Sequence, residues 1–248
     1  MQGGTLATDA ESARWGQDLV TELRQVFEPL ADADRSAPMQ ACMKDISPFL
    51  GIPARERRRT QKPVFAAAGP PPSSEALGAA GRSLWELDQR EYQYAGSELI
   101  ERHVGLLPAS FLVDHVEHLI TTKNWWDSVD ALVVDAVVRS VVAHPELKTV
   151  MRQWIEADNT WLVRAAIVHQ LGRGLETDRD LLFELCERRA GDREIFIAKA
   201  IGWALRDLSW RDPDSVARFI DSHPELTPFT RREGSKRIGQ ARRRLGAP

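Results

Sequence analysis

The chain has few cysteines and no long apolar run, and each shortage excludes a class of protein. Its 248 residues include 2 cysteines, Cys42 and Cys186, too few for a disulfide framework or a four-cysteine zinc site. No apolar run approaches the roughly 20 residues that a membrane-spanning helix needs. Residues 1–10 also lack the basic and apolar parts of a secretory signal. We therefore expect a protein inside the cell that is not attached to a membrane.

Motifs for cofactors are missing as well. The sequence has no GxGxxG or P-loop phosphate cradle and no HExxH metal motif. His115 and His118 in DHVEHLI lie three residues apart, a spacing that suits two zinc ligands, but no third and fourth ligand is evident. We expect neither a metal ion nor an organic cofactor.

Almost every segment has the pattern of a helix. Residues 129–142 (VDALVVDAVVRSVV) are rich in β-branched side chains, but an apolar run of this length favours a buried helix over a strand. Asn159, Asp178 and Asp212 stand before apolar stretches, as helix-capping residues do. Glycine and proline mark a loop near residues 68–75. The sequence predicts an all-α protein.

The chain also contains an internal repeat. HPEL occurs at residues 144–147 and again at 223–226. Helix starts near Asn124, Asn159 and Glu194 are about 35 residues apart, close to the period of HEAT and armadillo helix pairs. We predict a HEAT-like α-helical repeat solenoid with a concave face. It would form a single domain over residues 11–245, after a flexible N-terminus at 1–10.

Tryptophan is unusually frequent, with 8 Trp, as many as Phe, against 2 Tyr. In KNWWDSVD, Trp126 and Asp130 lie four residues apart and so share one face of a helix. Trp203 follows in FIAKAIGWALRD. A carboxylate beside indole faces attracts a cation, on a ligand or in a transition state. A single Trp on an apolar helix is more often a core residue, but the combined pattern favours a site.

Basic residues are concentrated in two segments, although the net charge is −3. Residues 55–63 and the tail from residue 227 hold clusters of Arg and Lys, and the rest of the chain is acidic. Such segregation fits either a solvated helix surface or a local basic face for nucleic acid.

Several of these segments resemble the AlkD-like DNA alkylation repair family. The resemblance is carried by TTKNWWDSVDALV, IEADNTWLVRAAIVHQL and FIAKAIGWALRDL, and extends in order over roughly residues 38–238. The resemblance implies a bacterial DNA glycosylase of HEAT-like repeats that acts on duplex DNA containing alkylated bases, and it makes the concave face of the solenoid a DNA-binding face. It also implies a cytoplasmic, nucleoid-associated monomer.

The family's site residues fall on matching residue types in this chain. Its catalytic aspartate falls on Asp130, the two tryptophans that pack on the lesion's deoxyribose on Trp126 and Trp203, and the arginine that contacts the DNA backbone on Arg164. Further candidate phosphate contacts are Arg206, Lys44, Arg57, Arg58, Arg232, Lys236 and Arg237.

The chemistry that the resemblance implies agrees with these residue types. Purines alkylated at N3 or N7 already carry positive charge, so the base leaves without a general acid. Asp130 would stabilise the oxocarbenium ion that develops on the sugar, and the indole faces would assist it. The family grips the sugar-phosphate backbone and does not enclose the base in a dedicated pocket, unlike most glycosylases.

Two positions depart from the family pattern, and two other functions remain open. Cys42 stands where many members have tyrosine, and Pro53 replaces a polar residue, so DNA affinity and lesion range can differ here. The alternatives are a non-catalytic module that binds damaged DNA and a HEAT scaffold for protein partners. The acidic net charge favours the scaffold, whereas the Asp and Trp residues favour the enzyme.

Overall fold

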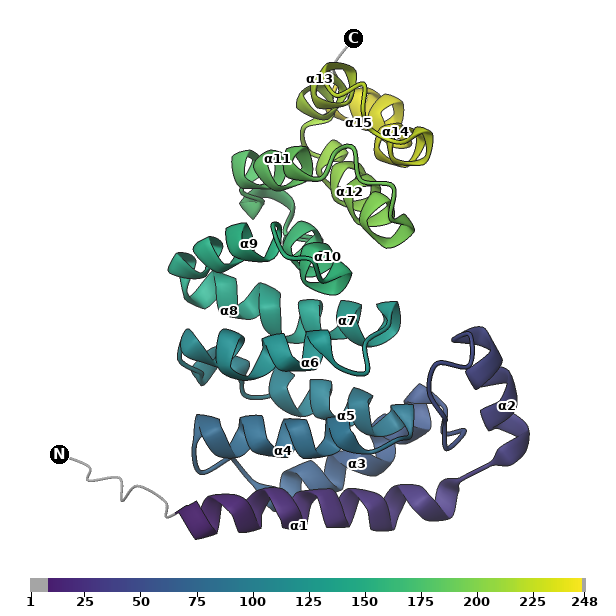
Figure 1. Ribbon diagram of the computed structural model, residues 1–248, viewed down its shortest axis with the longest axis vertical. Coiled ribbons are helices and arrows are strands. Elements are labelled where there is room, and N and C mark those ends of the chain that lie inside the picture. The colour runs from purple at the N-terminus through teal and green to yellow at the C-terminus, as the bar shows by residue number, and fades with distance from the viewer. Residues whose placement is uncertain (1–8, 247–248) are drawn as a thin grey trace, which may run out of the picture. The chain divides into compact units, whose positions relative to one another are not determined.

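The computed structural model describes residues 9–246, and these residues form helices joined by turns and short loops, without a strand (Figure 1). The all-α prediction is therefore confirmed. Most of the predicted flexible N-terminus lies outside the described residues, since the first helix begins at Asp9. Within the described part of the chain, no helix is both long and apolar enough to cross a bilayer.

The chain divides into two compact units, one ending at Ala143 and the other beginning at His144. The boundary falls at the first HPEL copy, directly before the short 3-10 turn Pro145–Leu147. The predicted single domain over 11–245 and its concave face stay predictions, and each unit is described by itself.

Unit 1 consists of stacked helices and one helix, α2 (Ala33–Cys42), that lies apart from the stack (Figure 1). Its α-helices are α1 (Asp9–Phe27), α2 (Ala33–Cys42), α3 (Ala54–Ala68), α4 (Ser74–Glu86), α5 (Arg90–Glu101), α6 (Glu117–Thr121), α7 (Trp126–Leu132) and α8 (Val138–Ala143). The π-helical segments η3 (Leu112–Val116) and η4 (Val133–Val137) precede α6 and α8. The predicted loop near 68–75 is confirmed between α3 and α4.

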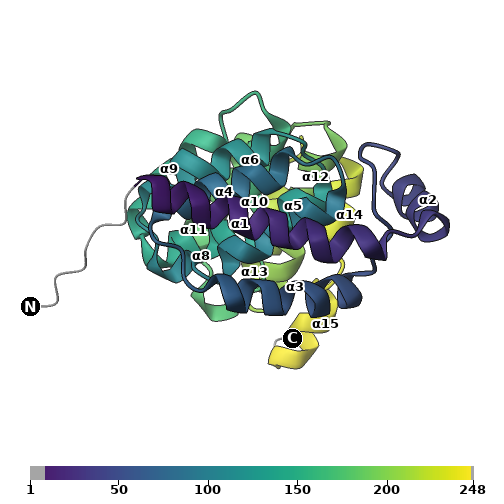
Figure 2. The same ribbon diagram turned by 90° about the horizontal axis from the view of Figure 1, so that it is seen from below.

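Helix α1 packs on α3 and α4, and Figure 2 shows α1 and α3 side by side. Helix α4 packs on α5, and α5 packs on α7. Leu19, Leu23 and Phe27 of α1 are buried in this core, at spacings of four residues that place them on one helix face. Each helix thus buries its apolar face on neighbours close in sequence, as in repeat proteins.

Residues 129–142 are helical, as their length predicts, but they do not form one regular α-helix. The segment α7 passes into η4 and then α8, so a π-helical turn lies in its middle. Such turns occur often at functional sites.

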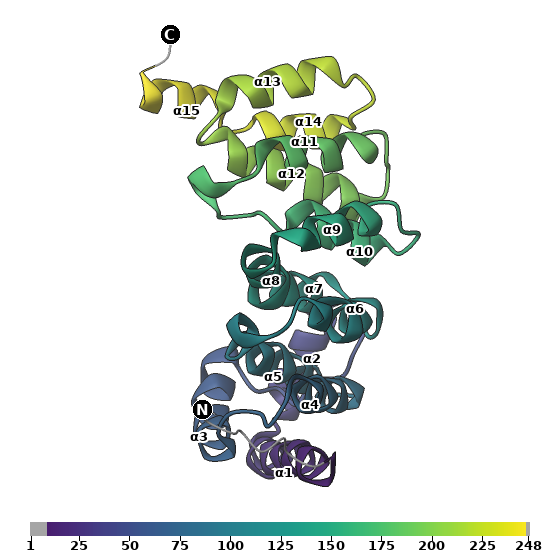
Figure 3. The same ribbon diagram turned by 90° about the vertical axis from the view of Figure 1, so that its left-hand side faces the viewer.

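Unit 2 is a stack of helix pairs (Figure 3). Its helices are α9 (Lys148–Trp154), α10 (Thr160–Val168), α11 (Arg179–Arg188), α12 (Ile195–Ser209), α13 (Pro213–Ser222), α14 (Pro228–Ser235) and α15 (Ile238–Leu245). Helix α12 packs against both α10 and α14. A Cβ atom added at Gly202 would lie only 3.0 Å from Glu233 Cβ, and one at Gly234 only 3.1 Å from Leu205 Cβ. These two glycines therefore allow α12 and α14 to approach closely.

The predicted capping residues begin helices in unit 2. Asn159 Oδ1 accepts hydrogen bonds from the amides of Trp161 and Leu162 at the start of α10. The side chains of Asp178 and Asp212 cap α11 and α13 in the same way. Each cap satisfies amide groups that the first helical turn leaves without partners.

Candidate active site and nucleic-acid interface

Helix α7 carries the unit 1 residues of the predicted site. The indole of Trp126 is 39% exposed, and Asp130, one helical turn later, is half-buried. Trp125 at the N-cap is extended, with φ −159° and ψ 168°, and its amide donates to Ser128 Oγ at 3.3 Å. The two consecutive tryptophans therefore differ in role, since Trp126 is presented to solvent and Trp125 ends the preceding loop.

A buried arginine holds the start of α7 in place. The guanidinium of Arg90 donates to both carboxylate oxygens of Asp127, at 2.6 and 3.0 Å, and to Ser128 Oγ at 2.8 Å. It also donates to the Lys123 carbonyl oxygen at 2.6 Å. Since Arg90 is fully buried, this network fixes the loop and first turn from which Trp126 and Asp130 project.

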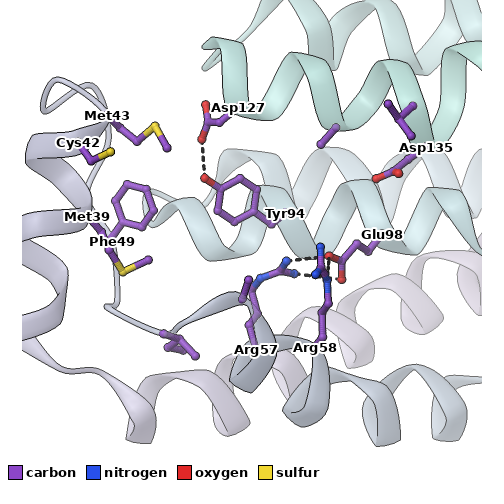
Figure 4. A pocket seen from close by; sticks show the side chains of 14 residues that line it. Met39, Cys42, Met43, Phe49, Arg57, Arg58, Tyr94, Glu98, Asp127 and Asp135 are labelled. Atoms are coloured by element: carbon purple, nitrogen blue, oxygen red, sulfur yellow. Dashed lines mark hydrogen bonds and ion pairs between the residues drawn. The ribbon is translucent and has the colours of Figure 1, made fainter. Parts of the chain in front are cut away.

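Asp127 stays ionised inside this network. Burial alone would raise the pKa of its carboxyl, but the hydrogen bonds and positive charge of Arg90 outweigh burial and hold that pKa below its usual range. Tyr94 also donates to Asp127, at 2.5 Å (Figure 4), and burial raises the pKa of the Tyr94 hydroxyl. Asp127 is thus a structural anchor of α7, distinct from Asp130.

Unit 2 brings Arg164 and Trp203 together. The Arg164 guanidinium carbon lies 4.9 Å from the centre of the Trp203 ring, within cation–π distance. Its Nη1 donates to the Phe196 carbonyl oxygen at 2.9 Å, and the residue is only 1% exposed. Arg164 therefore supports Trp203 here, and its contact with a DNA backbone stays a prediction.

A hollow of about 490 Å³ lies beside Trp203, formed by indole and guanidinium groups. Its lining residues are Leu171, Trp203, Arg206, Asp207, Trp210 and Arg237. Arg206 is paired with Glu233 of α14, and Arg237 lies over the Trp210 ring at 5.6 Å. Unit 2 thus combines indole rings with cations. In nucleic-acid-binding proteins, aromatic rings stack on unpaired bases and cations contact the phosphate backbone.

Trp210 was not predicted as a site residue. It lies seven residues after Trp203, which is two helical turns, so the spacing alone places both indoles near one face of α12 and its C-cap. That spacing is the signal that could have found it.

The other predicted phosphate contacts differ in exposure. Lys44, Arg232 and Lys236 are exposed, and Arg58 is 65% exposed although it pairs with Glu98 at 2.8 Å. Arg57 is 3% exposed, and its Nη1 and Nη2 donate to Glu98 and Gln61. This burial argues against the predicted phosphate contact of Arg57, because its charge is already matched inside unit 1.

No group of three or more His, Cys, Asp or Glu side chains among residues 9–246 has an arrangement that could hold a metal ion. His115 is buried and contacts the Phe111 ring at a centroid distance of 4.7 Å. Its pKa is lowered, first by burial and then by Arg82, which favours the neutral imidazole in this packing role.

Comparison with known proteins identifies a family. The family model described as "DNA alkylation repair enzyme" matches residues 23–238. A solved structure described as a predicted DNA alkylation repair enzyme from Enterococcus faecalis is 31% identical, with a TM-score of 0.77 over 84% of this chain and 97% of that chain. No curated protein matches. The chain therefore belongs to the DNA alkylation repair enzyme family, which gives it a role in the repair of alkylated DNA.

Proposed function

We propose that the protein is a DNA glycosylase that removes positively charged N3- and N7-alkylated purines from duplex DNA. The observation that carries this proposal is on α7, where the half-buried carboxylate of Asp130 follows an exposed indole by one turn. Membership in a DNA alkylation repair family supplies the substrate class.

The reaction is a hydrolysis in which a cationic purine leaves. The bond between C1′ and the base nitrogen breaks, and its electron pair neutralises the positive charge of the purine. A water oxygen then bonds to C1′, and its proton passes to Asp130 or to solvent. Because positive charge develops on the sugar, the Asp130 carboxylate and the faces of Trp126 and Trp203 stabilise the transition state more than the ground state. The products are a free alkylpurine and an abasic site.

Basic residues at the surface would bind the DNA backbone in this proposal. The candidates are the exposed Arg58, Arg232, Lys236, Arg237 and Lys44 and the half-buried Arg206. Arg164, which is buried, would orient Trp203, since its guanidinium carbon lies 4.9 Å from the centre of the Trp203 ring. These contacts carry no sequence information, so recognition of the lesion comes from its charge and its weakened glycosidic bond.

The test is release of 7-methylguanine from methylated duplex DNA by the purified full chain, measured by chromatography. We expect Asp130→Asn to slow release by about 100-fold or more while duplex affinity changes little. The matched control is Asp88→Asn in the same unit, whose side chain is 79% exposed; it should release base at the wild-type rate.

The same assay separates the two alternatives. A wild-type protein that binds the duplex but releases no base is a damage-binding module, and one that neither binds nor releases is a protein scaffold. Either result would overturn the glycosylase proposal, as would full activity of Asp130→Asn.

A further inference from the structure

Unit 2 has a row of aromatic side chains along α12. Phe196, Trp203 and the C-cap residue Trp210 follow one another at intervals of seven residues, which is close to two helical turns. The backbone of Trp210 is still helical, with φ −66° and ψ −22°, so the three rings start from one side of the helix. A cation lies over each of the first two rings, Lys199 at 5.8 Å from the centre of Phe196 and Arg164 at 4.9 Å from that of Trp203.

The last ring of the row has two cations over it. The guanidinium carbons of Arg237 and Arg244 lie 5.6 and 6.0 Å from the centre of the Trp210 ring. Arg237 donates one hydrogen bond, to Gln240 Oε1 at 3.1 Å, and both arginines are exposed. The half-buried indole therefore orients two guanidinium groups whose other N–H groups remain open to a ligand.

Two hollows meet at Trp210. One is the hollow of about 490 Å³ beside Trp203. The other, of about 240 Å³, lies toward the loop after α10, and Trp210 and Asp207 line both. The residues that line the second hollow are Gly172, Gly174, Asp207, Trp210, Arg211 and Arg244. Trp210 thus has guanidinium groups in both hollows, Arg237 in the first and Arg211 and Arg244 in the second.

Positive charge exceeds negative charge in these hollows. Among residues 9–246, no carboxylate oxygen lies within 4.0 Å of a guanidinium nitrogen of Arg211, Arg237 or Arg244. Asp207 lines both hollows, and its carboxylate accepts a hydrogen bond from the Gly172 amide at 3.0 Å. Three guanidinium groups without a carboxylate partner therefore outweigh one carboxylate, and the hollows attract an anion.

Other arginines of unit 2 are matched by acids. Arg206, which lines the first hollow, pairs with Glu233 of α14, and Lys236 lies 3.7 Å from the same carboxylate. On α11, Arg188 pairs with Glu156 at 2.9 Å. The three arginines around Trp210 differ from these, because the indole is their partner or neighbour and leaves their charge unneutralised.

We propose that Arg211, Arg237 and Arg244, held around Trp210, form a binding site for a backbone phosphate of DNA, on the strand that carries the lesion and within about three nucleotides of it. The placement of the lesion at Trp203 rests on the proposed function. Seven helical residues span about 10.5 Å, and a strand advances about 3.4 Å per nucleotide along the duplex axis. A strand that passes from Trp203 to Trp210 therefore covers about three nucleotides or fewer. A guanidinium group can stack on a ring and still bind two phosphate oxygens with its planar fork.

The site is tested by neutralising single phosphates of the DNA. The duplex carries one tetrahydrofuran residue, a stable abasic-site analogue from which no base can be released, so affinity is measured without turnover. A methylphosphonate, which lacks the phosphate charge, replaces one linkage at a time at about four positions on each side of the analogue. We expect one or two linkages within about three nucleotides to weaken binding by the full chain about tenfold.

Arginine variants identify the linkage that the site binds. Arg211→Gln and Arg244→Gln should each weaken binding to the unmodified duplex about tenfold. In these variants the critical methylphosphonate should cause less than about twofold further loss, because the contact is already gone. Arg188→Gln is the matched control, an arginine that is 57% exposed and paired, and it should keep both the affinity and the linkage profile of the wild type. A loss of folding, by contrast, would weaken binding alike at all linkages.

Variants of the indole test whether the ring orients the guanidinium groups. Trp210→Phe, which keeps a ring, should retain the loss at the critical linkage, and Trp210→Leu should abolish it. The reverse order would contradict the proposed role of the ring.

The proposal is overturned if no single linkage matters in the wild type, or if Arg211→Gln and Arg244→Gln keep the wild-type linkage profile. Base release from methylated duplex separates this result from the fate of the glycosylase. A wild-type protein that releases no base, but shows a linkage-specific loss that Arg244→Gln abolishes, keeps the phosphate site and overturns the glycosylase. A protein that releases base with the same linkage profile in all arginine variants keeps the glycosylase and overturns the phosphate site.

Discussion

At the scale of single residues, neighbouring acids in one helical stretch have different roles. Asp127 is matched by Arg90 and anchors the chain, Asp130 lies one turn from an exposed indole, and Asp135 has only a hydroxyl partner. The sequence WWDSVD does not distinguish these environments, because the partners of Asp127 and Asp135, Arg90 and Ser97, come from another helix, α5.

Asp135 makes stability depend on pH in a predictable direction. Its pKa is raised from 3.8 to about 6 by burial, so folding favours the protonated carboxyl. This contribution is present in full below the unfolded pKa and is lost as pH rises through about 6. We expect Asp135→Asn, which cannot ionise, to unfold about 1–2 kcal/mol less readily than the wild type at pH 8, a value discounted for solvent screening. Urea denaturation at pH 8 and near pH 4 checks this, and the gain should vanish at the lower pH.

At the scale of elements, the start of α7 depends on a helix about 35 residues away in the chain. Arg90 of α5 is its main support, through Asp127, Ser128 and the Lys123 carbonyl. The planar fork of arginine makes several of these bonds at once, which a lysine cannot do.

We therefore predict that Arg90→Lys destabilises unit 1 by about 3 kcal/mol, because buried acceptors lose their donors. Hydrogen exchange should be faster for the amides of residues 126–130, and base release should fall with it. Arg82→Lys is the control, since Arg82 is less buried and donates one bond to the Asp114 carbonyl, at 3.2 Å. Equal effects of the two changes would contradict this role of Arg90.

The loop before α3 lines a cavity together with Met39, Cys42 and Tyr94, and the conformation of this loop depends on a glycine. Gly51 has φ +90°, and a Cβ atom there would lie 2.2 Å from the Asp32 carbonyl oxygen, which belongs to the backbone and cannot easily move. The Glu91 carboxylate fixes this loop by accepting hydrogen bonds from the amides of residues 50–52, at 2.9–3.0 Å.

Gly51→Ala should cost about 3 kcal/mol or more in unfolding free energy, as measured by urea denaturation. Gly69→Ala is the control that distinguishes backbone strain from a steric clash. Gly69 also has a positive φ, +66°, but no atom lies within 4 Å of its added Cβ. It should cost about 1 kcal/mol. Similar losses for both variants would show that the contact with Asp32 is unimportant.

The sequence predicts those helices and helix caps that are determined by residues close together in the chain. The caps at Asn159, Asp178 and Asp212, and the helical character of 129–142, follow from residues within a few positions of one another. The Arg90 network, the burial of Arg57 against Glu98, and the cavity could not be predicted, since each joins side chains from different helices. Cys42 illustrates the difference, because the sequence marked it as a departure and the structure makes it part of a cavity wall.

At the scale of the whole molecule, the proposed catalytic residues are divided between the units. Asp130 and Trp126 belong to unit 1, and Trp203 belongs to unit 2. The net charge of −3 opposes DNA binding as a whole, so affinity must come from local clusters of exposed cations.

We accordingly predict that duplex affinity falls steeply with salt. Each phosphate contact contributes about 0.9 to the slope of log affinity against log salt. Arg232→Ala and Lys236→Ala should each reduce that slope by about 1 and weaken binding to all sequences alike. Arg24→Ala, at an exposed arginine of α1 that pairs with Glu28, is the control. Unchanged slopes for both tail variants would remove the C-terminal segment from the interface.

The close approach of α12 and α14 has a mechanical consequence. Gly202 lies against the Glu233 side chain and Gly234 against the Leu205 side chain, so the two helices approach closely, and the Arg206–Glu233 pair links the same helices. The indole of Trp203 on α12 and the cations near residue 232 on α14 therefore belong to one rigid pair of helices. A larger side chain at either glycine would push α12 and α14 apart. It would thereby displace the Trp203 indole and the cations near residue 232 together, although neither glycine would itself contact a nucleotide.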